Sequence, residues 1–72
     1  MNKLLLKNII KAINTELKNG LISVEIESNN HHFVCYKPID IDYDGNMISV
    51  YINDDCIKIH YKTIDSIKIV EL

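Results

Sequence analysis

Three aspartates alternate along one segment in the middle of the chain: Asp40, Asp42 and Asp44. On a β-strand every second side chain points to the same face, so these carboxylates would form a row spaced at about 7 Å. That spacing is close to the separation of successive phosphates along a nucleic-acid strand, and such a row would attract a basic protein groove. We interpret the row as a candidate protein-binding surface that mimics nucleic acid. The alternatives are a solvated strand face whose like charges discourage aggregation, and weak binding of a divalent cation.

Further acidic and aromatic residues lie near this row in the sequence. Asp54 and Asp55 fall in a predicted turn, and Tyr51 falls on the polar side of a predicted strand. Exposed tyrosine rings are common in protein interfaces, so we assign Tyr51, Asp54 and Asp55 to the same partner-binding surface. Core packing is the expected role of Tyr43 and Tyr61.

The side chains that could bind a metal do not form a metal motif. They are His31, His32, Cys35, Cys56 and His60. Cys56 and His60 are four residues apart, about 13 Å on a strand, whereas zinc ligands lie within about 2.3 Å of the metal. No loop is long enough to shelter a catalytic Cys–His pair. We therefore predict no metal, no cofactor and no catalytic residue.

The N-terminal segment has the apolar periodicity of an amphipathic helix over residues 3–18. Asn2 is a suitable N-cap, and Asn19-Gly20 is a suitable end because glycine adopts the left-handed conformation readily. Apolar residues recur at steps of three and four, at Leu4, Leu5, Leu6, Ile9, Ile10, Ile13 and Leu17.

The rest of the chain alternates apolar and polar residues with a period of two, which indicates strands with one buried face. The predicted strands cover residues 21–28, 31–43, 46–52, 56–62 and 67–71. We expect an α+β fold in which the N-terminal helix is followed by a five-stranded, strongly bent antiparallel sheet.

Turn residues separate these strands. Asn29-Asn30 and Asp44-Gly45 are suited to tight hairpins, and residues 53–55 form another predicted turn. Residues 63–66 resemble a short helical turn before the last strand. Pro38 lies inside the long second strand and cannot donate to a sheet, so it either bends the strand or stops it.

Length and charge narrow the function classes. The chain has 72 residues, a net charge of −2 and eight basic residues, all of them lysine. A nucleic-acid binder is usually basic and rich in arginine, which binds phosphate and guanine with two hydrogen bonds. A single domain of this size buries only roughly 60% of its unfolded surface, so we expect it to form a homo-oligomer. Two cysteines and no apolar run of about 20 residues favour a cytoplasmic protein without membrane contact.

The predicted order of elements resembles the Sm-like branch of the SH3-like small barrels. Residues 61–66 are also similar to the tyrosine–lysine–histidine–alanine–isoleucine–serine segment of the bacterial RNA chaperone Hfq family. Tyr61, Lys62 and Ser66 match that segment, whereas Thr63 replaces the histidine. The glutamine near the helix and the glycine of the second strand in that family have no counterpart here. The resemblance implies a ring-shaped oligomer that binds uridine-rich RNA, with Tyr61 and Lys62 as its RNA-binding residues.

These observations favour a non-enzymatic regulatory protein that binds another protein, one with a basic nucleic-acid-binding groove. The abundance of Ile, Asn, Lys and Asp is typical of A/T-rich genomes, and a regulator or inhibitor carried by a phage or mobile element fits it. The alternative function is an Sm-like RNA-binding ring.

Overall fold

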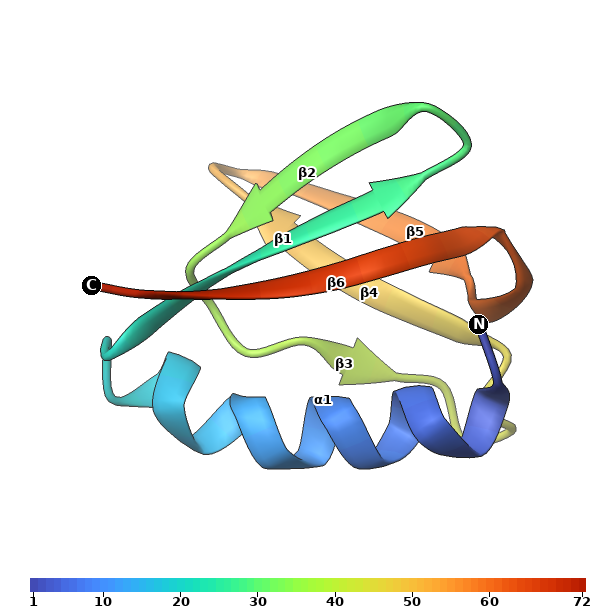
Figure 1. Cartoon of the computed structure of the whole chain (residues 1–72), viewed down its shortest axis with the longest axis horizontal. Coiled ribbons are helices and arrows are strands. Elements are labelled where there is room, and N and C mark those ends of the chain that lie inside the picture. The colour runs from blue at the N-terminus through green and yellow to red at the C-terminus, as the bar shows by residue number, and fades with distance from the viewer.

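One helix, six strands and a short 3-10 turn make up the structure, a computed structural model that describes all 72 residues. In chain order they are α1 (Lys3–Lys18), β1 (Ile22–Ser28), β2 (His31–Cys35), β3 (Asp40–Ile41), β4 (Met47–Ile52), β5 (Asp55–His60), η1 (Tyr61–Thr63) and β6 (Ile64–Glu71). The strands form two antiparallel sheets of three, in the orders β2–β1–β6 and β3–β4–β5. The helix runs along one side of both sheets (Figure 1). The predicted α+β class is confirmed, but two separate sheets replace the single five-stranded sheet.

The helix α1 covers the predicted range, and its ends have the predicted signals. The side-chain oxygen of Asn2 accepts a hydrogen bond from the backbone N–H of Leu5 at 3.0 Å, which satisfies one free donor of the first turn. Gly20 follows the helix with a φ of +70°, where other residues are strained. The apolar periodicity produces one buried stripe, made of Leu6, Ile10, Ile13 and Leu17.

In the first sheet, β1 lies between β2 and β6. The β1–β2 turn is the predicted Asn29-Asn30 pair, whose φ values of 48° and 65° suit asparagine. On its other side β1 pairs with β6 from Ile22 opposite Glu71 to Ser28 opposite Ile64. The first and last strands of the chain are therefore neighbours.

In the second sheet, β4 lies between β3 and β5. The β4–β5 hairpin turns at Asn53, which has a φ of 55°, and extends from Ile52 opposite Asp55 to Met47 opposite His60. The strand β3 contributes only two residues, Asp40 and Ile41, to the edge of this sheet.

The predicted second strand, residues 31–43, is wrong as a single strand. The chain leaves the first sheet after Cys35 and enters the second at Asp40, so residues 36–39 form a crossover. Pro38 lies in this crossover and has no N–H to continue a sheet. Of the two outcomes left open by the sequence, the strand stops near Pro38 and does not continue through a bend.

The crossover is held to the helix by one side chain. The Asn14 side-chain amide donates to the carbonyl oxygen of Ile39 at 2.9 Å, and the Ile39 N–H donates to the Asn14 side-chain oxygen at 2.8 Å. Ile39 itself is only 1% exposed and is part of the core. Asn14 therefore satisfies both backbone groups of a residue that has no neighbouring strand at this point.

The predicted helical turn over residues 63–66 is wrong in position, because the turn η1 comes two residues earlier. The His60 ring accepts a hydrogen bond from the Lys62 N–H at 3.1 Å, and the Thr63 hydroxyl donates to the His60 carbonyl at 2.9 Å. These contacts cap the turn at His60. The last strand consequently begins at Ile64, three residues before the predicted start.

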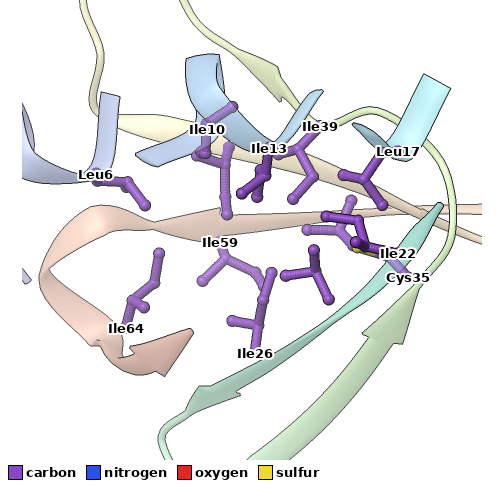
Figure 2. Close-up of a cluster of buried hydrophobic side chains, with 13 residues drawn as sticks. Leu6, Ile10, Ile13, Leu17, Ile22, Ile26, Cys35, Ile39, Ile59 and Ile64 are labelled. Carbon is purple, nitrogen blue, oxygen red and sulfur yellow. The ribbon is translucent and has the colours of Figure 1, made fainter. Parts of the chain in front are cut away.

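The core lies between the helix and the two sheets and contains residues from all of them (Figure 2). The thiol of Cys35 is buried there, and this burial raises its pKa to about 11, so it stays an uncharged apolar group. The thirteen buried core residues are Leu6, Ile10, Ile13, Leu17, Ile22, Val24, Ile26, Cys35, Ile39, Ile48, Val50, Ile59 and Ile64.

We expect Asn14→Ala to lower the free energy of unfolding by about 2 kcal/mol, because it leaves the Ile39 N–H and C=O without partners. Urea unfolding followed by circular dichroism measures this loss. The matched control is Asn8→Ala, since Asn8 is an exposed residue of the same helix and the change in helix propensity is the same. Equal stabilities of the two variants would show that the Asn14 contacts contribute nothing.

Candidate functional site: a groove at the start of the helix

The loop between β3 and β4 is built by hydrogen bonds within itself. The Gly45 N–H donates to the Asp42 carbonyl at 2.8 Å, and the Asp42 N–H donates to the Met47 carbonyl at 3.0 Å. The Asp44 carboxylate accepts from the Asn46 N–H at 3.0 Å and from the Asn46 side-chain amide at 3.2 Å. Gly45 has a φ of +76°, so the predicted Asp44-Gly45 turn is confirmed. The loop is a defined structure that can hold its side chains in place.

This loop and the first turns of α1 form the two walls of an open groove. The volume of the groove is about 570 Å³, and the ring of Tyr61 lies on its lining. The loop approaches the helix closely at Gly45, where an added Cβ would lie 3.0 Å from Cε of Lys3. The lining residues are Asn2, Lys3, Leu4, Lys7, Asp42, Tyr43, Asp44, Gly45 and Tyr61.

The walls of the groove carry opposite charges that do not pair with each other. Lys3 and Lys7 lie on the helix, and Asp42 and Asp44 lie on the loop. The only side-chain ion pairs within 4.0 Å in the structure involve His32, elsewhere on the surface. The ammonium of Lys3 instead lies 5.7 Å from the centre of the Tyr61 ring, within cation–π range. No ion pair within the chain therefore neutralises these four charges.

Two apolar side chains extend from the groove into solvent. Tyr43 is fully exposed at the tip of the loop, and Leu4 is 66% exposed on the helix. The expectation that Tyr43 packs in the core is wrong, because its loop leaves the sheet before this residue. Tyr61 does pack against the core and is half-buried, as predicted.

The predicted row of Asp40, Asp42 and Asp44 does not form on one strand. Only Asp40 belongs to β3, whereas Asp42 and Asp44 lie in the loop that follows. The regular spacing required for nucleic-acid mimicry depended on the strand over residues 31–43, so this part of the interpretation is corrected. Asp42 and Asp44 both line the groove, whereas Asp40 lies outside it.

Asp40 is the hydrogen-bond acceptor of Tyr51. The Tyr51 hydroxyl donates to the Asp40 carboxylate at 2.6 Å across the outer surface of the second sheet. This hydrogen bond, together with smaller effects of desolvation and of the nearby negative charge, raises the pKa of Tyr51 to about 12. Tyr51 is thus held by Asp40 and lies outside the groove.

Asp54 and Asp55 lie at the opposite end of β4 from the groove. Asp54 lies in the β4–β5 turn and Asp55 begins β5, whereas Asp42 and Asp44 precede the start of β4. Six strand residues separate the two ends, which corresponds to about 20 Å. The structure therefore divides the predicted acidic surface into two.

The two residues of the RNA-binding alternative are adjacent in η1. The Lys62 ammonium lies 6.0 Å from the centre of the Tyr61 ring, and the Lys3 ammonium approaches the same ring. The amino group of Met1 donates to the carbonyls of Tyr61 and Ile64, both at 3.1 Å, which fixes the turn against the start of the helix.

Comparison of this chain with models of protein families, with curated proteins and with solved structures finds no match. The one helix of the chain is too short and too polar to cross a bilayer.

A cluster that sequence reasoning missed lies on the outer face of the first sheet. His32 contacts Glu25 through Nε2 at 3.0 Å and Glu27 through Nδ1. The hydrogen bond to Glu27 is the main reason why the pKa of His32 is raised. The register of the β1–β2 hairpin was the available signal, because it places Glu27 opposite His32. Both ring nitrogens are engaged, and no group of three such side chains is arranged to hold a metal ion.

Because the pKa of folded His32 is raised above its unfolded value of 6.5, the protonated ring stabilises the fold. This contribution should be complete below pH 6.5 and should disappear as the pH rises through the raised pKa of the folded state. Urea unfolding between pH 5 and pH 9 measures it, with Glu27→Gln as the comparison. In that variant the His32 resonances should titrate at lower pH, and an unchanged titration would contradict the assignment.

Proposed function

We propose that this chain is a non-enzymatic binding module that docks on a basic segment of another protein through the groove at the start of the helix. The observation that carries the proposal is Tyr43, fully exposed at the tip of a hydrogen-bonded loop and flanked by Asp42 and Asp44. An aromatic ring held on an ordered loop loses little conformational entropy on binding, so it is an effective anchor.

The charges of the groove support a basic partner segment. A lysine or arginine beside the loop would meet Asp42, which is half-buried, and Asp44. It would also lie near the face of the Tyr43 ring, an arrangement that favours cations. Lys3 and Lys7 on the other wall would repel that lysine or arginine. The charges therefore favour one orientation of the partner in the groove.

Binding is a better account of this groove than catalysis. Its charged groups lie at an open surface, and Lys3, Lys7 and Asp44 are exposed. Catalytic acids and bases are typically removed from solvent so that their pKa values are shifted toward their task. The groove also lacks a cysteine, serine or histidine that could act as a nucleophile with an adjacent base.

We expect a photo-crosslinker placed at Tyr43 to capture a basic protein partner, and Asp42→Lys to reduce that capture at least tenfold. The charge reversal places a cation against the basic segment, and the measurement is mass spectrometry of the crosslinked product from the native host. A crosslinker at Tyr36 is the matched control. Tyr36 is also exposed but lies in the crossover between β2 and β3, outside the groove.

Two further variants test the location of the binding site. Asp54→Lys makes the same charge reversal at the far end of β4 and should leave the capture unchanged. If Asp54→Lys reduces the capture and Asp42→Lys does not, the acidic β4–β5 turn is the docking site and the groove is not.

The alternative function is an Sm-like RNA-binding ring, and the edges of the two sheets favour it. Each of β5 and β6 pairs with one neighbour only, so each has one edge free for a strand of another copy. Head-to-tail pairing of different edges generates a closed ring when the rotation closes. The ring would place Tyr61 and Lys62 of each copy around its axis as the uridine-binding residues.

Native mass spectrometry of nuclease-treated protein separates the two functions. A closed hexamer or heptamer that binds oligouridine, with binding abolished in Lys62→Ala, is the expected result for the ring. A monomer or dimer would contradict the ring, and so would an oligouridine affinity that Lys62→Ala leaves unchanged.

A further inference from the structure

A second pocket opens between the two sheets and shares no residue with the groove at the start of the helix. It lies between the β1–β2 hairpin, β5 and the end of η1, and its volume is about 350 Å³. Figure 1 shows the tip of this hairpin on the side of the molecule away from the helix, with β5 behind it. The volume is within the range of small-molecule sites, which begins at about 300 Å³.

The ionisable side chains of this pocket are basic, whereas the whole chain has a net negative charge. Ten residues line the pocket, and none is Asp or Glu, although the chain has ten acidic residues and a net charge of −2. The pocket includes Lys58 and two of the three histidines, His31 and His60. This concentration of basic groups without a carboxylate is complementary to an anion.

The β1–β2 hairpin gives its two adjacent histidines different surroundings. His32 lies opposite Glu27 and contacts the carboxylates of Glu25 and Glu27 on the outer face. His31 lies opposite Ser28 and lines the pocket, with no carboxylate within ion-pair distance. His31 is therefore free to interact with an anion from solvent.

His60 is held in a form that can donate a hydrogen bond. Its Nδ1 accepts from the Lys62 N–H at 3.1 Å, so the proton of the neutral ring is on Nε2. The nearby hydroxyls are already engaged, because Ser28 donates to Thr63 at 2.9 Å and Thr63 donates to the His60 carbonyl. The lysine, the two imidazoles and the side-chain amide of Asn29 are thus the polar groups left to bind the ligand.

Four of the ten lining residues are apolar, and one of them carries an aromatic ring. The Phe33 ring lies 6.2 Å from the His31 ring, centre to centre, at an angle of 31°. Ile57 and Ile59 of β5 also line the pocket. Phe33 and Ile57 are half-buried and offer apolar contacts beside the basic groups, where a planar ring can pack.

We propose that this pocket binds a small phosphate monoester that carries a flat ring. Lys58, His31 and His60 bind the phosphate, and Phe33 packs against the ring. A single nucleotide and a phosphorylated aromatic alcohol share this chemistry. An extended nucleic-acid strand fits less well, because it needs a row of cations along several phosphates and the pocket has one lysine. This site goes beyond the proposed docking function and does not depend on it.

Titration of the full chain with AMP and with phenyl phosphate, followed by NMR amide shifts and by calorimetry, tests the proposal. We expect both ligands to shift the amides of residues 31, 33, 58 and 60, and adenosine, which lacks the phosphate, to bind at least tenfold more weakly. Tighter binding of AMP than of phenyl phosphate would identify the source as a nucleotide, and the reverse order would identify a phosphorylated aromatic alcohol.

Variants separate this site from general attraction to the surface. Lys58→Ala and His31→Ala should each weaken AMP binding at least about tenfold, as expected for loss of a charge-assisted hydrogen bond. His32→Ala is the matched control and should leave the affinity unchanged. All three residues are exposed, so the variants retain the core.

Each of the following results would overturn the proposal. They are an unchanged affinity in Lys58→Ala, shifts confined to residues outside the pocket, equal affinity for adenosine and AMP, and binding of an oligonucleotide without binding of AMP. Equal affinity for AMP and inorganic phosphate would also overturn it, because the flat ring would then contribute nothing.

Discussion

The two hydrogen bonds between Asn14 and Ile39 determine how the helix is placed on the sheets. Apolar packing alone is not directional, so a stripe of leucine and isoleucine could slide along the faces that it covers. The Asn14 amide fixes one point of the helix to one residue of the crossover at 2.8 and 2.9 Å. The same contact satisfies a buried backbone that has left one sheet and not yet entered the next. Asn14 therefore supplies a directional contact between the helix and the segment that joins the two sheets.

The groove at the start of the helix follows from this alignment. Asn14 fixes the helix beside the start of β3, and the loop that follows β3 then returns along the first turns of the helix. The amino group of Met1 fixes the same end of the helix to η1. The groove is thus placed by contacts on both of its walls, while the charged side chains that face it form no ion pair with one another. An ordered backbone with free side-chain charges is the usual arrangement of a recognition surface.

The sequence predicts the local elements well and their assembly less well. Asn2, Gly20, Asn29-Asn30 and Gly45 mark element ends that depend only on backbone conformation, and all lie where expected. Pro38 alone predicts either a bend or an end of the strand, and the observed end is accompanied by a contact between Ile39 and Asn14, twenty-five residues apart, that the sequence does not reveal. The prediction of an acidic row on one strand was wrong for the same reason. The positions of Asp42 and Asp44 depend on where β3 ends, and β3 ends at Ile41. The histidine contacts with Glu25 and Glu27 required a strand register, which periodicity alone does not give.

The two sheets differ in how far apart their paired strands lie in the sequence. The pairing of β1 with β6 makes the first sheet depend on segments that are distant in the chain. The strands β3, β4 and β5 are consecutive in the chain, so their sheet can form from local contacts. The first sheet needs Ile22 to meet Glu71, at the far end of the sequence. During synthesis β1 and β2 therefore wait as a lone hairpin, which is marginally stable in water, until the last strand has been made. The eight residues of β6 complete the first sheet, which residues 1–63 alone cannot form in full.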